Sequence, residues 1–158
     1  MLILAGGTLS AGASSACSSS SSTGGADGGA ACYPDNDGIN DDAYTVELTV
    51  DDTGFSKKIV NTQNDSQVTF TLKNAGTKPH GFEVGCTDAR ASYPDLPAGC
   101  SATVCFPADA KIAPIAPGKS ETIVFDTPTP DDLIYPFKSS EPDDGKVAGL
   151  SDGQWSLM

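Results

Sequence analysis

The sequence predicts an all-β fold, a Greek-key β-sandwich of seven to eight strands, over residues 44–158. Short runs in which apolar and polar residues alternate recur along this part of the chain, as is typical of half-buried strands. The chain also contains 17 Gly and 11 Pro, which favours many turns and few long helices. About 115 residues are enough for one sandwich core.

Four strands are expected in the first half of the domain. Residues 44–51 alternate without interruption between apolar and polar side chains. A short strand is expected at 58–60 after a turn, and a third at 68–73, where Val68, Phe70 and Leu72 occupy alternate positions. The fourth, 80–84, begins at His80, the single histidine of the chain.

The second half contains a long connection and then three more strands. Residues 85–111 are rich in Pro, Gly and Cys, and a connection of this length needs a covalent link to be ordered in a compact domain. Pro117 and Gly118 suit the centre of a type II turn. Strands are expected at 120–126, 133–138 and 153–157.

The five cysteines divide into one and four. Cys17 lies in the low-complexity N-terminal region, whereas Cys32, Cys86, Cys100 and Cys105 flank or belong to the β domain. Four cysteines can pair in three ways, and the sequence alone does not choose among them. We favour Cys86 with Cys105 and Cys32 with Cys100. Two disulfides indicate an oxidising, extracytoplasmic compartment.

The N-terminal region predicts export followed by a tether. Residues 1–16 combine a short apolar run with small residues, as a signal peptide does. The residues before Cys17 resemble a bacterial lipobox, although Ser14 replaces its usual leucine, so Cys17 is the candidate lipidation site of an envelope lipoprotein. Ordinary secretion is the alternative. Residues 17–43 are rich in Ser, Gly and Asp and are expected to be a flexible tether.

The end of this tether is dense in oxygen ligands. Residues 35–42 contain Asp and Asn around Gly38. The EF-hand pattern fails, because with Gly38 at its sixth position Tyr33 and Tyr44 occupy places that require carboxylates. An acidic linker into the first strand is the favoured interpretation, and a looser calcium loop is the alternative.

The charge of the chain limits its partners. The formal net charge is −12, and the sequence contains no block of basic residues. Nucleic acid is therefore excluded as a partner, and an anionic membrane surface would repel the domain. The expected partner is an unknown protein or another envelope component, with membrane contact only through the lipid anchor.

From residue 44 to residue 157 the chain resembles the cupredoxins, the family of plastocyanin and azurin. The resemblance rests on the strand at 68–74 followed by Gly76 and His80, on the turn at 116–120, and on Tyr135-Pro136-Phe137. It implies the cupredoxin fold. It also implies where a blue copper ion would be held, by the first histidine and by a late loop with the pattern C-x(4)-H-x(3,4)-M.

The late loop departs from that pattern. Aligned on the aromatic run, Ser139 occupies the cysteine position and Asp144 the second histidine position. The methionine position falls near Ala148 or Leu150, and neither Met1 nor Met158 lies in this loop. A blue site needs a thiolate and two imidazoles, and only His80 remains. We therefore expect no copper or other cofactor, although weak metal binding by His80 with Asp144 or Asp143 is an alternative. The structural interpretation of His80 is a locally hydrogen-bonded histidine.

The resulting hypothesis is an envelope-tethered binding or structural module without a functional blue-copper site. The alternative is a metal-binding or electron-transfer cupredoxin that uses His80 with acidic ligands. An enzyme is not expected, because the sequence lacks a Gly-x-Ser-x-Gly nucleophile motif. The paired acids at 51–52, 131–132 and 143–144 are expected to be solvated turn residues.

Overall fold

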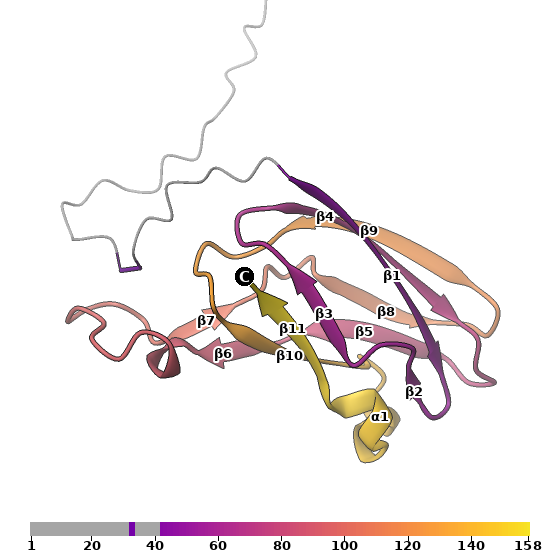
Figure 1. Cartoon of the computed structure of the whole chain (residues 1–158). Coiled ribbons are helices and arrows are strands. Elements are labelled where there is room, and N and C mark those ends of the chain that lie inside the picture. Colours follow the sequence, from indigo (N-terminus) through magenta and orange to yellow (C-terminus); the bar gives the residue numbers. More distant parts are fainter. Residues whose placement is uncertain (1–31, 34–41) are drawn as a thin grey trace, which may run out of the picture.

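Figure 1 shows the computed structural model of the chain, which describes residues 32–33 and 42–158. The expected signal peptide, the Cys17 lipidation site, most of the tether and most of the Asp-rich stretch lie outside the described residues. Within the described part, no helix is long and apolar enough to cross a bilayer.

One layer of the sandwich is a four-stranded sheet in the order β2-β1-β4-β9. Strand β1 pairs in parallel with β4 from Ala43 to Val50, in a register that turns the apolar residues of both strands toward the same core. Strand β4 then pairs antiparallel with β9. The strands span Ala43–Asp51 (β1), Gly54–Phe55 (β2), Gln67–Asn74 (β4) and Ser120–Asp126 (β9).

The other layer is a five-stranded sheet in the order β3-β11-β10-β5-β8. Its central strands carry the largest aromatic side chains, and Pro136 lies on β10 beside Gln154 of β11. The strands span Ile59–Thr62 (β3), His80–Val84 (β5), Lys111–Ile115 (β8), Ile134–Lys138 (β10) and Gly153–Leu157 (β11).

The long connection after β5 contains structure that the sequence did not predict. Strands β6 (Cys86–Asp88) and β7 (Thr103–Cys105) form a two-stranded ribbon, and a 3₁₀ helix covers Ala89–Ala91. Disulfides join Cys86 to Cys105 and Cys32 to Cys100, which is the favoured pairing. These strands are too short to show an alternating pattern, so the sequence predicted only a linked loop there.

The two sheets enclose an aromatic core. Phe70 of β4 stacks on Phe82 of β5 with ring centroids 4.2 Å apart, and Trp155 of β11 packs against both rings. The Trp155 indole N–H donates to Thr62 Oγ1, so this buried polar group is satisfied. The core thus joins strands of both layers and supports the expected sandwich fold.

The described residues contain eleven strands rather than seven or eight. The difference comes from the short strands β2, β6 and β7 and from β8, for which no strand was predicted. At one end of the sandwich, the β1–β2 turn and the β4–β5 loop meet the segment after β10. That segment forms a 3₁₀ helix, η2 (Pro142–Lys146), and the short helix α1 (Ala148–Ser151) (Figure 1).

Candidate functional site

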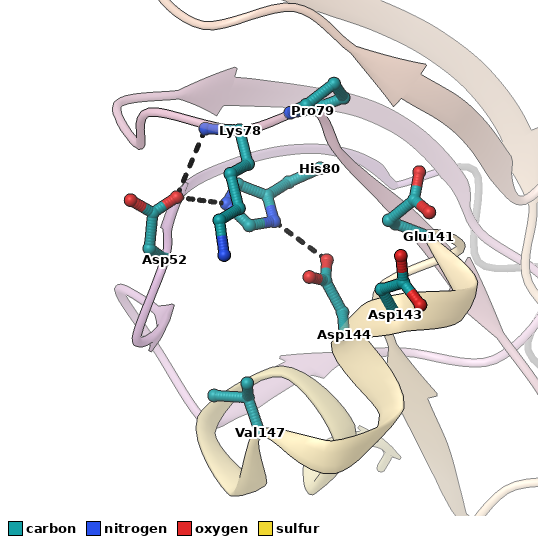
Figure 2. A pocket seen from close by; sticks show the side chains of 8 residues that line it. All are labelled: Asp52, Lys78, Pro79, His80, Glu141, Asp143, Asp144 and Val147. Carbon is teal, nitrogen blue, oxygen red and sulfur yellow. Dashed lines mark hydrogen bonds and ion pairs between the residues drawn. The ribbon is translucent and has the colours of Figure 1, made fainter.

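The histidine of the chain is buried at this end of the sandwich. His80 is the first residue of β5, and only 1% of it is exposed. Figure 2 shows its ring between Asp52, from the β1–β2 turn, and Asp144, from η2. Each ring nitrogen faces one carboxylate, so three segments that are distant in sequence meet on one imidazole.

The contact with Asp144 is the more buried of the two. His80 Nδ1 lies 2.7 Å from Asp144 Oδ2, and Asp144 is only 6% exposed. The same carboxylate oxygen accepts a hydrogen bond of 2.5 Å from Ser139 Oγ. The Ser139 hydroxyl in turn accepts hydrogen bonds from the backbone N–H groups of Gly81 and Glu141. Asp144 Oδ2 therefore links β5, the end of β10 and η2.

The contact with Asp52 is more open to solvent. His80 Nε2 lies 2.9 Å from Asp52 Oδ1, and the Asp52 side chain is 33% exposed. Thr77 donates to this carboxylate through its hydroxyl, 2.6 Å away, and through its backbone N–H. The Thr77 hydroxyl and the His80 ring hold the pKa of Asp52 well below its usual range. Asp52 is therefore ionised at neutral pH.

The two carboxylates favour the charged form of the ring. Burial lowers the pKa of His80, but the hydrogen bonds and charges of Asp144 and Asp52 raise it by more, and the net shift is upward. Because a neutral imidazole has one N–H, it can donate to only one of two carboxylates, whereas an imidazolium donates to both. The geometry at both nitrogens is thus that of an imidazolium.

Asn74 holds the loop that presents His80. Its side-chain amide donates to the carbonyl groups of Lys78 and Ile115, 2.7 and 2.8 Å away. Its Oδ1 accepts the Gly76 backbone N–H at 2.8 Å. Asn74 is fully buried, and these bonds satisfy backbone groups of the β4–β5 loop and of β8 that would otherwise lack a partner inside the protein. The loop is therefore fixed in front of β5.

Two glycines leave room for this arrangement. A Cβ atom on Gly76 would lie 2.7 Å from Asp52 Oδ1 and 2.9 Å from His80 Nε2, closer than real Cβ contacts. A Cβ atom on Gly81 would collide with Ser140 Oγ. The absence of side chains at these positions is a requirement of the site, and Gly76 in particular permits the contact between His80 and Asp52.

A cavity of about 390 Å³ opens beside the ring (Figure 2). Asp143 and Glu141 present their carboxylates at its rim, and Lys78 lies across from them. The ring itself contributes little to the cavity surface, because only 1% of His80 is exposed. The lining consists of Asp52, Lys78, Pro79, His80, Glu141, Asp143, Asp144 and Val147.

The solved structures that are similar to this chain include auracyanins. The chain is similar to reduced auracyanin of Roseiflexus castenholzii, with a TM-score of 0.52 and 23% identity over 72% of this chain and 96% of that one. It is also similar to auracyanin A, described as a blue copper protein of Chloroflexus aurantiacus (TM-score 0.50, 16% identity, 74% and 100% covered). The domain has a cupredoxin-like fold. No protein-family model and no curated protein sequence matches the chain.

The residues at the cupredoxin copper positions do not fit a blue copper ion. A serine hydroxyl and a carboxylate replace the thiolate and the second imidazole, and they are bonded to each other. The four described cysteines are all in disulfides, and the described methionine, Met158, is exposed at the C-terminus. Within residues 32–33 and 42–158, no group of three His, Cys, Asp or Glu side chains is arranged to hold a metal.

The structure brings together the two residues that the sequence selected as weak metal candidates, His80 and Asp144, but as a hydrogen-bonded ion pair. Asp143, the other candidate, is exposed at the cavity rim. The expectation of solvated turn residues is wrong for Asp144, which is buried. It is incomplete for Asp52, which also bonds to His80, a contact that is not apparent from the sequence.

The expected local hydrogen bonding of His80 is also wrong, because both partners are distant in sequence. Asp144 lies 64 residues after the histidine, and Asp52 lies 28 residues before it. The alignment that placed Asp144 at a ligand position was the one available signal. For Asp52 the sequence carries no signal, since Asp51-Asp52-Thr53-Gly54 has the composition of an ordinary turn.

Proposed function

We propose that this chain is an envelope-tethered, cupredoxin-like binding or structural module in which an internal ion pair replaces the copper centre. The observation that carries the proposal is the position of Asp144 Oδ2. This one atom contacts both His80 Nδ1 and Ser139 Oγ, the two side chains that align with copper ligands. The side chains at the three aligned ligand positions therefore hydrogen-bond to one another and do not converge on a metal site.

The ion pair has a structural role in this proposal. A buried charge is costly unless it is paired and hydrogen-bonded, and Asp144 receives hydrogen bonds from two partners. In a blue copper protein the metal joins the loops at this end of the sandwich. Here the proton-bearing ring of His80 joins the β1–β2 turn to η2, so the end of the domain is closed without a metal.

Electron transfer or metal binding through His80 with acidic ligands is the alternative function. It requires Nδ1 or Nε2 to lose its proton and its carboxylate contact before a metal can bind, and one imidazole with carboxylates offers little selectivity. Calorimetric titration of the wild type and the His80→Ala variant with Cu(II), Zn(II) and Ca(II) tests it. The proposal expects equal heats, and a site lost in the variant would favour the alternative.

A catalytic function is not proposed. A hydrolytic triad needs an imidazole that accepts the proton of a nucleophile. The Ser139 hydroxyl donates to Asp144 rather than to the ring, and both ring nitrogens already face carboxylates. The chain is a small single domain that resembles auracyanin, and a role in binding other molecules suits it better than catalysis.

The two disulfides support an extracytoplasmic location, because such bonds persist in oxidising compartments. We further propose that Cys17 is lipidated and anchors the domain to the bacterial envelope. Expressing the full chain and its Cys17→Ser variant in a bacterial host tests the anchor. The variant should move from the membrane fraction to the soluble fraction, and unchanged fractionation would contradict it.

Copper binding is tested directly by titrating the full chain with Cu(II) and recording visible absorption and electron paramagnetic resonance spectra. The Cys17→Ser variant is the matched control, because it removes the one cysteine outside the two disulfides. We expect no intense blue band in either protein. One tight blue site per chain would overturn the proposal.

A further inference from the structure

Strand β1 has a free edge along most of its length. On one side it pairs with β4 from Ala43 to Val50. On the other side β2 pairs only with its last two residues, Val50 and Asp51. Over residues 43–48, no described strand pairs with this second side. A free strand edge is a template for the addition of another strand.

The hydrogen-bonding direction along β1 identifies the unpaired groups. The Thr49 N–H donates to Ser56 Oγ at 2.9 Å, and its carbonyl accepts the Ser56 N–H at 2.7 Å, so Thr49 faces the β2 side. The Val50 carbonyl instead accepts the Ala75 N–H on the β4 side. Because these directions alternate along a strand, the peptide groups of residues 45 and 47 face the free edge.

A groove follows this edge. It has a volume of about 290 Å³ and lies between β1 and β3, the edge strand of the other sheet. Tyr44 and Val46 line it from β1, and Ile59, which is 58% exposed, lines it from β3. The rest of the lining is mostly polar and consists of Thr45, Lys57, Val60 and Asn61. At the opposite seam of the sandwich, β8 and β9 lie against each other. The β1–β3 seam therefore offers unpaired backbone groups together with a few apolar side chains in a largely polar groove.

The edge also has few of the features that usually protect free strands. Residues 43–48 contain no Pro or Lys and pair with β4 without a bulge. Glu47 is the single charged residue among them and is exposed, and the exposed Asp42 precedes them. With a net charge of −12, two copies of the chain repel each other, so self-association through this edge is disfavoured.

We propose that the β1 edge binds an extended basic peptide segment of a partner protein by β-strand addition. The backbone of the segment pairs with the peptide groups of Thr45 and Glu47. Its apolar side chains enter the groove against Tyr44 and Val46, and its alternate Lys or Arg side chains lie near Glu47 on the outer face. The proposal gives the binding module a surface, and it does not depend on the state of His80.

The test uses the full chain and a short synthetic peptide in which valine alternates with lysine. Amide hydrogen exchange, followed by NMR, reports each backbone N–H. In the free chain the amides of Thr45 and Glu47 should exchange rapidly, whereas those of Tyr44 and Val46 are protected by β4. Saturating peptide should slow exchange at Thr45 and Glu47 by at least about tenfold. A peptide with glutamate in place of lysine is the control and should give no protection.

The Thr45→Pro variant removes one donor at the free edge but leaves the pairing with β4 intact, and edge strands tolerate proline. It should keep its fold and lose binding of the lysine peptide. If this variant does not fold, the Glu47→Lys variant replaces it and should prefer the glutamate peptide.

Two results of the exchange experiment would overturn the proposal. One is that the lysine peptide at saturation does not slow amide exchange, and the other is that the amides of Thr45 and Glu47 are already protected in the free chain. A wild-type dimer in sedimentation that Thr45→Pro abolishes would identify a second copy as the occupant and also overturn it. None of these outcomes changes the result that is expected from the copper titration of the full chain.

Discussion

Replacing Asp144 by asparagine tests the ion pair at the centre of the site. The variant keeps the volume of the side chain and removes its charge, so the buried His80 ring loses one of its two anionic partners. Removing one member of a buried ion pair costs about 3–5 kcal/mol. We expect the free energy of unfolding to fall by about 3 kcal/mol, at the low end of that range, because Asp52 still contacts His80 Nε2. For a domain of this size, the melting temperature should fall by about 10 °C.

The loss of stability in Asp144→Asn should become smaller as the pH rises. The pKa of His80 is raised in the folded state, so its contribution to stability is fully present below its unfolded pKa and disappears as the pH rises through the folded pKa. The difference between wild type and Asp144→Asn should therefore be large at about pH 5.5 and smaller at about pH 9.

Urea denaturation with the disulfides intact measures this difference at both pH values. Asp143→Asn is the matched control, because it removes the same charge from the exposed neighbour on η2. It should change the free energy of unfolding by less than about 0.5 kcal/mol. Equal stabilities of the two variants at about pH 5.5 would refute the assignment of Asp144 to the buried pair.

Three further predictions concern the same end of the fold and its connection. Gly76→Ala should separate His80 from Asp52 and lower the pKa of the histidine in an NMR titration, and an unchanged pKa would contradict the steric argument. Ser139→Cys combined with Asp144→His should create a blue copper site, detected by visible absorption, whereas neither single variant should. Replacing both cysteines of the β6–β7 disulfide by serine should cost about 3 kcal/mol in urea denaturation, and a cost near zero would show that the ribbon is ordered without it.

Much of the scaffold follows from local patterns. The bounds of β5, β9 and β11 match the residues predicted. Strands β9 and β11 bury one face, which gives an alternating pattern, whereas the start of β5 was marked by His80. The alternation in β1 is also visible in the sequence. The pattern does not extend to β6 and β7, where three-residue strands are ordered by a disulfide and by the ribbon they form with each other.

The site was predictable only in part, since its partners come from three separate segments. The motif that precedes His80 and the alignment of the late loop identified this residue and Asp144 from sequence. Their direct bond was not predictable, because the exposure of Asp144 depends on how η2 folds back over β5. Asp52 reaches the ring only because the β1–β2 turn packs against the β4–β5 loop, a contact that no local pattern encodes.

The central claim is that a doubly hydrogen-bonded imidazolium replaces the copper centre. The chain has one histidine, so the ring ¹⁵N NMR spectrum of His80 contains two nitrogen signals from a single residue. Recording it near neutral pH, before and after one equivalent of Cu(II), tests the claim directly. We expect both nitrogens to be protonated and their signals to be unchanged by copper. A nitrogen without a proton before the addition, or signals lost to the paramagnetic ion after it, would contradict the account.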